Sequence, residues 1–335
     1  MVSCYHYFEI IIRTSISMKK LLFLINPLSG KTEGQKIEEK LFSILKNHLP
    51  TKEYDIVATE PDSKDQLSHI CPDYEKVVAA GGDGTISNII QAMTGFGWKQ
   101  KIGIIPLGTG NDLARSLGIL ETAETGGLES LIKIILKGKT KQLDILEVNN
   151  KYICVNYFGL GNDAAILNDF NAFRTNESNR LIFKYSLGKA VYLFVGVKRL
   201  NYKIPEGTIL SCNRADSEQI QMNFDSSIRA ILISNISSYG GGAIPSSKAQ
   251  TDDRVFEVTI IKSIKEWAAL HLSRFTKKQL DIVCPGISQI QTDRVEILLP
   301  ETTFCQADGE IIEGLSEIEK KIVVKIKSYV DIIVS

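Results

Sequence analysis

Short apolar runs alternate with amphipathic segments through the first part of the chain. The apolar runs have the length of buried strands and cover residues 20–25, 54–59, 77–80 and 102–105. Between and after them, apolar side chains recur at helical spacing in residues 37–49, 86–93, 113–117 and 128–135. Strands that alternate with helices predict a parallel α/β sheet with helices on its faces.

The pattern changes after about residue 150, where strands predominate. The expected strands cover residues 152–158, 219–224, 228–235, 254–261, 294–299 and 321–326. Ile220, Met222 and Phe224 alternate with polar residues, as in half-buried antiparallel strands. Helices are expected only within residues 180–199 and 265–277. This half is therefore predicted to be a β-rich domain.

The two patterns suggest where the domains begin and end. Residues 1–17 are expected to be an unstructured extension, because Met18-Lys19-Lys20 directly before a strand resembles a natural start. An α/β domain is assigned to residues 18–142 and a β-rich domain to residues 143–324. Residues 325–335 could pack back on the first domain.

Composition narrows the class of protein. Of 335 residues, 44% are hydrophobic and 23% charged, which is typical of a folded protein. Basic and acidic residues both number 39, so no overall charge favours nucleic acid or an anionic bilayer, although a local basic patch remains possible. The six cysteines contain no Cys-x-x-Cys pair, which favours reduced thiols in a cytoplasm.

No stretch reads as a transmembrane helix or a signal peptide. The apolar residues 8–25 are interrupted by Glu9, Arg13, Lys19 and Lys20, which prevents one uncharged span. The positive charges also do not precede the apolar part, as they do in a signal peptide.

Three turns rich in glycine, proline and asparagine follow the predicted parallel strands. They are Asn26–Gly30, Gly81–Thr85 and Gly108–Asp112. The carboxyl ends of parallel strands meet at one edge of a sheet, where ligands bind. Glycine lets the backbone approach a ligand, and the amides at a helix start suit a phosphate. The alternative is a set of tight turns in which Asp83 merely caps a helix. A P-loop is excluded, because Ile25 stands where its first glycine is needed.

Three motifs in the second half of the chain can be interpreted either as structural turns or as functional sites. Gly159–Ala164 matches G-x-G-x-x-A, but the surroundings are no obvious βαβ unit, so a structural turn is preferred. Thr251–Arg254 can be a hairpin turn with solvated carboxylates. Asp308–Glu310 can be a turn as well, or a carboxylate site that faces a transferred phosphate.

Together, these motifs resemble those of the diacylglycerol kinase catalytic-domain family, which includes sphingosine and ceramide kinases. The matching residues are the three turns, with the third extending over Pro106–Arg115, together with Asn156–Ala164, Asn235–Gly242 and Asp308–Glu310. The sequence of Pro106–Arg115 is nearly identical to the corresponding motif of diacylglycerol kinases, whereas sphingosine kinases usually have a different sequence there. The resemblance covers nearly everything after Met18.

The resemblance implies a fold and a nucleotide site. The fold is an α/β plus β protein: a Rossmann-like parallel domain similar to those of NAD kinase and phosphofructokinase, followed by a β-rich sandwich domain. The implied ATP-binding residues are Asn26, Pro27, Ser29, Gly30, Thr59, Gly81, Gly82, Asp83, Gly84, Thr85, Asn88, Gly108, Thr109, Gly110 and Asn111.

The resemblance also implies metal and catalytic residues. Asp83 would help to hold the catalytic Mg²⁺, and Asp308 would be the general base for the acceptor hydroxyl, with Glu310 orienting that hydroxyl or assisting the metal. A structural Mg²⁺ would bind Asp253 and main-chain oxygens near Gln250 and Val255. The family commonly has glycine after this aspartate, where this chain has Arg254.

The expected activity is an ATP-dependent lipid kinase that converts diacylglycerol to phosphatidic acid. The alternatives are a sphingoid-base or ceramide kinase, an NAD kinase, and a catalytically silent nucleotide-binding regulator. We expect a cytoplasmic protein that touches the membrane surface transiently, because a lipid acceptor requires membrane contact. The balanced charge predicts no nucleic-acid partner. A homodimer is a further expected partner state.

One basic and aromatic segment could touch anionic headgroups. Its residues are Arg174, Arg180, Lys184 and Lys189, interleaved with Phe170, Phe173, Phe183 and Tyr185. A solvated loop with core-facing aromatics is the preferred interpretation.

Overall fold

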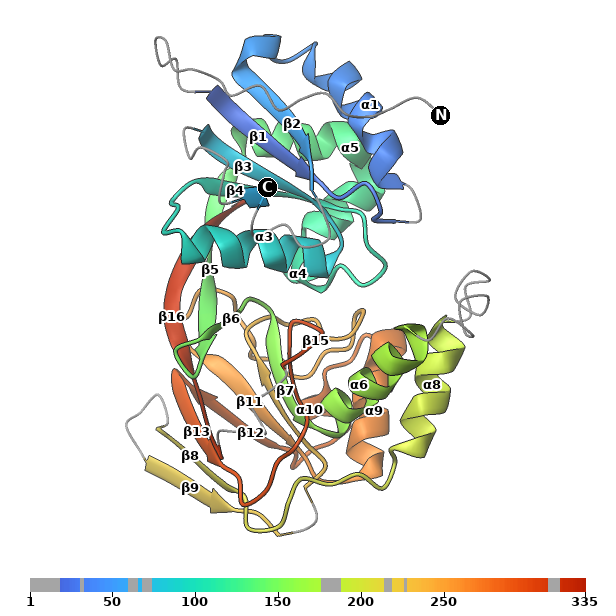
Figure 1. Ribbon diagram of the computed structural model, residues 1–335, viewed down its shortest axis with the longest axis vertical. Helices are drawn as coiled ribbons and strands as arrows, with labels where there is room; N and C mark the ends of the chain where they lie inside the picture. The colour runs from blue at the N-terminus through green and yellow to red at the C-terminus, as the bar shows by residue number, and fades with distance from the viewer. Residues whose placement is uncertain are drawn as a thin grey trace.

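The computed structural model describes residues 19–30, 33–59, 66–67, 74–175, 188–213, 219–225, 228–312 and 320–335. The extension expected at residues 1–17 lies outside these ranges. Figure 1 shows two lobes, with both ends of the described chain in the upper one. The upper lobe contains the first helices and strands, and two long strands run from it into the lower lobe.

The upper lobe is a parallel sheet with helices around it. Its strands are β1 (Lys19–Ile25), β2 (Tyr54–Ala58), β3 (Tyr74–Gly81) and β4 (Lys101–Pro106), in the order β2-β1-β3-β4. The helices are α1 (Glu33–Leu45), η1 (Thr51–Glu53), α3 (Asp83–Gly95), α4 (Asp112–Ser116) and α5 (Ile119–Lys137). Leu22, Phe23 and Leu24 in β1 are fully buried, because helices cover both faces of the sheet.

The sheet continues from the upper lobe into the lower one. β5 (Lys139–Val148) pairs with β16 (Lys321–Val334) along almost its whole length. β16 also pairs with β4 in parallel, through Ile332 and Ile102, and with β13 (Arg294–Leu298) antiparallel. The sequence analysis missed β5 and found only the first part of β16. Charged residues interrupt the apolar pattern of both strands, so neither has the continuous apolar run by which a buried strand is recognised. Pairing with neighbouring strands keeps them in the sheet.

The lower lobe is a sandwich of two sheets. The second sheet has the order β12-β11-β10-β7-β14-β15. Its strands are β7 (Tyr157–Gly161), β10 (Ala230–Ser234), β11 (Phe256–Ile261), β12 (Ser288–Thr292), β14 (Cys305–Ala307) and β15 (Glu310–Ile311). β6 (Tyr152–Cys154), β8 (Ile209–Asn213) and β9 (Gln219–Asn223) extend the first sheet. Phe158 and Val258 from one sheet share a core with Leu146 and Val324 from the other.

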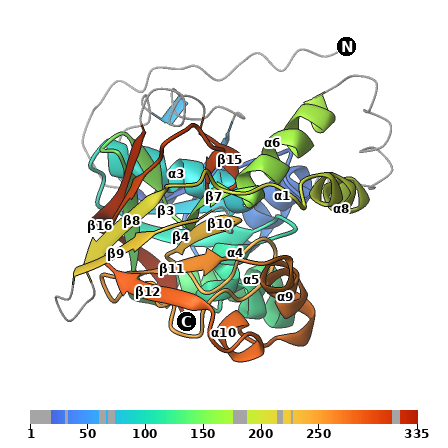
Figure 2. The same cartoon turned by 90° about the horizontal axis from the view of Figure 1, so that it is seen from below.

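The described part of the lower lobe also contains four helices. They are α6 (Asn162–Thr175), α8 (Gly188–Lys198), α9 (Ile264–Thr276) and α10 (Leu280–Val283). Of these, α6 contacts the second sheet and α8 packs on α6. The turn expected at Gly159–Ala164 is not observed, because residues 159–161 end β7 and residues 162–164 begin α6. The sequence analysis did not predict this helix. Figure 2 shows α9 and α10 together at one corner of this lobe. Among the described residues, no helix is both long and apolar enough to cross a bilayer.

The strand predicted at residues 152–158 is interrupted, which matters for the site. β6 ends at Cys154 and β7 begins at Tyr157, so Val155 and Asn156 leave the sheet ladder. Their backbone amides are thereby available to a side chain from elsewhere in the fold.

Arg254 fastens the loop before β11 to the long strand β5. Its guanidinium bonds the carboxylate of Asp144 at 2.7 Å, and its backbone N–H donates to the second oxygen of Asp144, also at 2.7 Å. The guanidinium also donates to Gln142 and lies over the ring of Tyr329. Asp144 is fully buried, whereas the Arg254 side chain is 43% exposed. Burial raises the pKa of Asp144, and the two bonds from Arg254 oppose that rise.

We predict that Arg254 stabilises the fold in spite of its left-handed backbone, at φ 64°. Removing one partner of a buried ion pair costs about 3–5 kcal/mol, and the exposure of Arg254 lowers this to about 2 kcal/mol. Arg254→Ala should therefore lower the free energy of unfolding by about 2 kcal/mol in a urea titration. Arg254→Gly should lose about 1 kcal/mol less, because glycine relieves the left-handed strain. Wild-type stability in both variants would contradict the role of the ion pair.

Candidate active site

The three glycine-rich turns meet at the carboxyl edge of the upper sheet. Asn26 Nδ2 donates to Thr85 Oγ1 at 2.8 Å, which joins the first turn to the second. Leu107 N donates to the carbonyl of Gly81 at 2.8 Å, which joins the second to the third. The turns predicted to converge are therefore in contact.

Glycine is required where the second and third turns touch. A β-carbon on Gly108 would lie 2.7 Å from the Cα of Gly82 and 2.8 Å from Asn111 Oδ1. Asn111 shapes the third turn from within, since its side chain accepts from Gly108 N at 3.0 Å and donates to Gly108 O at 2.8 Å. Beside Gly84, in contrast, a β-carbon would meet nothing within 4 Å. Space for a ligand thus exists at the start of α3, where helix amides lack intrahelical partners.

The first turn and Thr59 lie at one side of this surface. Asn26 Oδ1 accepts from Leu28 N at 2.9 Å, and Asn26 O accepts from Ser29 N, which holds the loop around Pro27 tight. Gly30 ends the turn at φ 63°. Thr59 N donates to Ile25 O at 2.7 Å, so Thr59 follows β2 directly beside the first turn.

The hydroxyl oxygen of Thr59 is the feature that fits a polar ligand best. It is buried and has no hydrogen-bond partner among the described residues. A buried hydroxyl without a partner is costly, and a nucleotide beside the turns would supply one. Asn88 stands on the second turn of α3, on the element that begins with the Gly82–Thr85 turn. The residues present therefore fit ATP.

Asp83, the first residue of α3, lies between the second and third turns. A β-carbon on Gly110 would lie 2.7 Å from its Oδ2, and Leu113 N donates to its Oδ1 at 3.4 Å. Burial, followed by the nearby charge of Asp112, raises the pKa of Asp83 to about 6. A carboxylate that is destabilised by burial and a like charge gains from a bound cation. Asp83 therefore fits the role of a Mg²⁺-holding group.

Asp112 ties the third turn to the second domain. Its buried carboxylate accepts from Ser238 Oγ at 2.5 Å and from Gly241 N and Gly242 N, both at 2.9 Å. These donors belong to the Asn235–Gly242 stretch, to which the sequence analysis gave no role. At its start, Asn235 Nδ2 donates to Val155 O at 3.1 Å.

Asp308 is held by the interruption between β6 and β7. Its carboxylate accepts from Val155 N at 2.8 Å, Asn156 N at 2.7 Å and Tyr157 N at 3.3 Å. Gln91 Nε2 on α3 donates to it at 3.2 Å. Burial raises the pKa of Asp308, and the backbone amides oppose that rise. Glu310, two residues later, is exposed.

α3 connects the two groups of polar residues. Asp83, Ser87 and Gln91 are spaced four residues apart and therefore lie along one face of the helix. Ser87 Oγ accepts from Asn156 Nδ2 at 3.0 Å, and Gln91 reaches Asp308. At 1.5 Å per residue, Gln91 lies about 12 Å along the helix from Asp83. Sequence reasoning missed Ser87 and Gln91, although their spacing from Asp83 was a usable signal.

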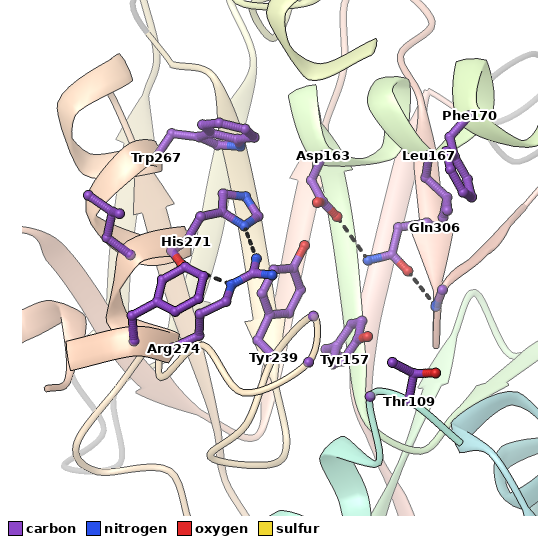
Figure 3. A pocket seen from close by; sticks show the side chains of 16 residues that line it. Thr109, Tyr157, Asp163, Leu167, Phe170, Tyr239, Trp267, His271, Arg274 and Gln306 are labelled. Atoms are coloured by element: carbon purple, nitrogen blue, oxygen red, sulfur yellow. Dashed lines mark hydrogen bonds between the residues drawn. The ribbon is translucent and has the colours of Figure 1, made fainter. Parts of the chain in front are cut away.

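A cavity of about 670 Å³ opens beside the third turn (Figure 3). Thr109 and Gly110 form part of its wall, and the rest comes from the second domain. The lining is mostly aromatic and aliphatic and includes Tyr157, Leu167, Phe170, Tyr239, Trp267, Leu272 and Phe275. The rings of Tyr157 and Tyr239 meet edge to face at 4.7 Å. Such a lining suits an apolar ligand with one polar end.

Polar groups line the cavity at two places. Near the third turn, Gln306 Nε2 donates to Asp163 Oδ2 at 3.3 Å, and Gln306 Oε1 accepts from Gly309 N at 2.9 Å, which fixes the Asp308–Glu310 turn (Figure 3). On α9, the Arg274 guanidinium bonds His271 Nδ1 at 2.8 Å. Burial and the charge of Arg274 lower the pKa of His271 to about 4, so the ring is neutral at pH 7.

Sequence reasoning placed none of the α9 residues in a site. Trp267, His271 and Arg274 recur at helical spacing, and this pattern was a signal that a helix face carries chemistry.

The residues expected to hold a structural Mg²⁺ lie in the loop before β11. Asp253 Oδ1 accepts from Val255 N at 3.3 Å, and Gln250 is exposed. The Arg254 guanidinium already faces the buried Asp144 carboxylate nearby. Within the described ranges, no three Asp, Glu, His or Cys side chains gather as metal ligands. The structural Mg²⁺ stays a prediction, and no later step depends on it.

Comparison with known proteins gives the same family for both lobes. The family model "Diacylglycerol kinase catalytic domain" matches residues 20–148, and "Diacylglycerol kinase accessory domain" matches residues 153–311. A Caenorhabditis elegans protein named "Probable diacylglycerol kinase 3" is 29% identical over 67% of this chain; the match spans only 31% of that longer protein. "Probable lipid kinase YegS-like" from Enterobacter sp. (strain 638) is 27% identical over 86% of this chain and 89% of its own length.

A solved structure supports the fold. The crystal structure of a diacylglycerol kinase from Bacillus anthracis str. Sterne superposes with a TM-score of 0.64, at 19% identity, over 96% of this chain and 99% of that one. Together, the two adjoining family matches span most of the sequence, and the fold agrees with them. The chain belongs to the diacylglycerol kinase catalytic-domain family of lipid kinases.

Proposed function

We propose that the protein transfers the γ-phosphoryl group of ATP to the free hydroxyl of diacylglycerol and so forms phosphatidic acid. One observation carries the proposal: Thr109 and Gly110 belong both to the third phosphate-facing turn and to the wall of the apolar cavity. A phosphate on the turns and a hydroxyl held in the cavity beside Thr109 and Gly110 would therefore be neighbours. Such positioning is the main contribution that a protein makes to phosphoryl transfer.

The character of the cavity supports a lipid acceptor. Aromatic and aliphatic side chains dominate its lining, and the polar Asp163–Gln306 pair lies at the end near the Asp308–Glu310 turn. Acyl chains would occupy the apolar part, and the hydroxyl would point toward that turn. The names of the relatives favour diacylglycerol over sphingoid bases and ceramide as the acceptor. The resemblance of Pro106–Arg115 to the diacylglycerol kinase motif favours it as well. The second lobe favours a lipid over NAD as acceptor, because it matches an accessory domain of diacylglycerol kinases.

The residues of the three turns have distinct tasks in this proposal. The glycine-rich backbone of the second and third turns binds phosphate oxygens. Asn26 in the first turn and Thr59 beside it orient the nucleotide. Asp83 holds the cation in place, which requires the deprotonated carboxylate. When bound there, Mg²⁺ would supply positive charge that offsets the negative charge of the phosphates. Leu113 N and the start of α4 keep Asp83 aimed at that position.

The geometry favours Glu310 over Asp308 as the proton acceptor. The family resemblance implies Asp308, and that assignment stays a prediction. The carboxylate of Asp308, however, already accepts from three backbone amides and from Gln91, which stands eight residues after Asp83 on α3. Glu310 is exposed and follows Gly309, which lines the cavity. In this proposal Asp308 is a positioning residue that fixes the turn carrying Glu310.

The acceptor is tested by assaying ATP consumption separately with diacylglycerol, ceramide, sphingosine and NAD. We expect turnover with diacylglycerol, dependent on Mg²⁺, and at least tenfold less with the other three. Turnover with ceramide, sphingosine or NAD instead would identify the corresponding rival kinase. Binding of ATP without turnover on any acceptor would identify a silent nucleotide-binding regulator.

Asp83→Asn should remove activity and preserve the fold. Loss of a metal-holding carboxylate should lower kcat/KM by at least about 100-fold, or about 2.7 kcal/mol. Because the pKa of Asp83 is raised from 3.8 to about 6, its charged form destabilises the folded state above pH 6. The ligand-free variant should therefore unfold at an equal or higher temperature than the wild type at pH 7.5, and this gain should vanish near pH 4. Unchanged turnover would exclude the metal-holding role.

Glu310→Gln and Asp308→Asn should have different effects. We expect Glu310→Gln to lower kcat by about 100-fold or more without changing the melting temperature, because the exposed side chain acts only on the proton. Asp308→Asn should lower the melting temperature, since its amide nitrogen would face backbone donors that now bond a carboxylate. An unchanged kcat in Glu310→Gln would exclude Glu310 as the proton acceptor and favour Asp308 in that role.

A further inference from the structure

We propose that the corner formed by α9 and α10 is the surface with which the protein docks on an anionic phospholipid bilayer. This inference rests on the proposed lipid acceptor and adds the route by which that acceptor reaches the cavity. Leu272 and Phe275 line the cavity, yet Leu272 is 58% and Phe275 76% exposed. They therefore stand at its mouth, where a lipid must enter.

The apolar surface continues beyond the cavity. On α9, Ile264, Leu272 and Phe275 recur at helical spacing and are all exposed. The adjoining helix α10 adds Ile282, which is 59% exposed, and Val283. Figure 2 shows both helices at one corner of the lower lobe. Grouped exposed side chains of this size mark an interaction surface rather than ordinary scatter.

Basic side chains near the exposed apolar residues of α9 and α10 favour an anionic partner. Residues 262–283 contain five basic and two acidic side chains, whereas the whole chain contains 39 of each. Lys262, Lys265, Lys277 and Lys278 are exposed. The two acids have local partners: Glu266 caps α9 through Ser263, and Asp281 accepts from Ser247. Apolar side chains ringed by lysines fit the headgroup region of an anionic leaflet.

The cavity wall explains why docking at this corner is useful. Thr109 and Gly110 of the third turn line the same cavity as Leu272 and Phe275. A lipid that left the bilayer between Leu272 and Phe275 would extend its polar end toward that turn without crossing water. The apolar body of the lipid would then stay in contact with Tyr239 and Trp267.

The segment that the sequence suggested for headgroup contact gives no competing surface among the described residues. Residues 176–187, which include Arg180, Phe183, Lys184 and Tyr185, lie outside the described ranges, as does the side chain of Lys189. Of the remainder, Phe170 lines the cavity and Phe173 packs against Ile166 and Val191. These aromatics face the interior.

The test is co-sedimentation of the full chain with vesicles, without nucleotide or acceptor. We expect binding to vesicles of phosphatidylcholine mixed with phosphatidylglycerol, and weaker binding to phosphatidylcholine alone. Leu272→Ser with Phe275→Ser should weaken binding at least about tenfold, because both apolar side chains stay in water. Lys277→Gln with Lys278→Gln should weaken it about fivefold per lysine, and mainly at low salt.

A matched control is Phe42→Ser on α1, because Phe42 is 54% exposed but lies in the upper lobe. This variant should bind vesicles as the wild type does. Equal binding by the wild type and the Leu272/Phe275 variant would overturn the proposal. So would a change in the oligomeric state of that variant without a change in vesicle binding, since the corner would then join two copies of the chain.

A second assay separates docking from catalysis. Ile282→Ser with Val283→Ser changes the corner outside the cavity. This variant should phosphorylate diacylglycerol in vesicles about tenfold more slowly, yet retain wild-type turnover on a water-soluble short-chain diacylglycerol. Equal loss on both substrates would contradict docking. If the wild type lacked activity on both substrates but bound vesicles through the corner, the proposed reaction would fail and the docking surface would stand.

Discussion

The structure depends on a buried carboxylate, that of Asp112, which joins the two lobes where the site lies. Asp112 follows the third turn, and its oxygens accept from Ser238, Gly241 and Gly242 in the second domain. A buried carboxylate without such donors would cost several kcal/mol, on the order of a whole domain's stability. The third turn and the wall of the cavity that the second domain provides are therefore fixed relative to each other. The same negative charge also helps to raise the pKa of Asp83.

α3 makes the second connection between the lobes. It begins with the glycine-rich turn, and one face of it reaches Asn156 through Ser87 and Asp308 through Gln91. The interruption between β6 and β7 supplies the amides that hold Asp308. Because β5 and β16 also run through both lobes as one sheet, the site lies on a rigid frame rather than on a hinge between independent domains.

Local patterns predicted the upper lobe well, and long-range pairing limited the rest. The strands of the parallel sheet are continuous apolar runs, and their turns carry glycine where backbones touch, as at Gly82 and Gly108. β5 was missed because Lys139, Lys141 and Asp144 break its apolar pattern, and its place in the sheet depends on β16, almost 200 residues away. The donors that surround Asp308 are likewise distant in sequence, so no spacing revealed that its carboxylate is already used. The α9 residues of the cavity matched no motif, because a cavity depends on how elements pack.

The most direct test of this account is a crystal structure with a non-hydrolysable ATP analogue and Mg²⁺. The account predicts the triphosphate between the Asn26–Gly30, Gly81–Thr85 and Gly108–Asp112 turns, the cation beside Asp83, and the γ-phosphate pointing into the cavity at its wall of Thr109 and Gly110. A nucleotide bound away from these turns, or a γ-phosphate directed away from the cavity, would contradict it.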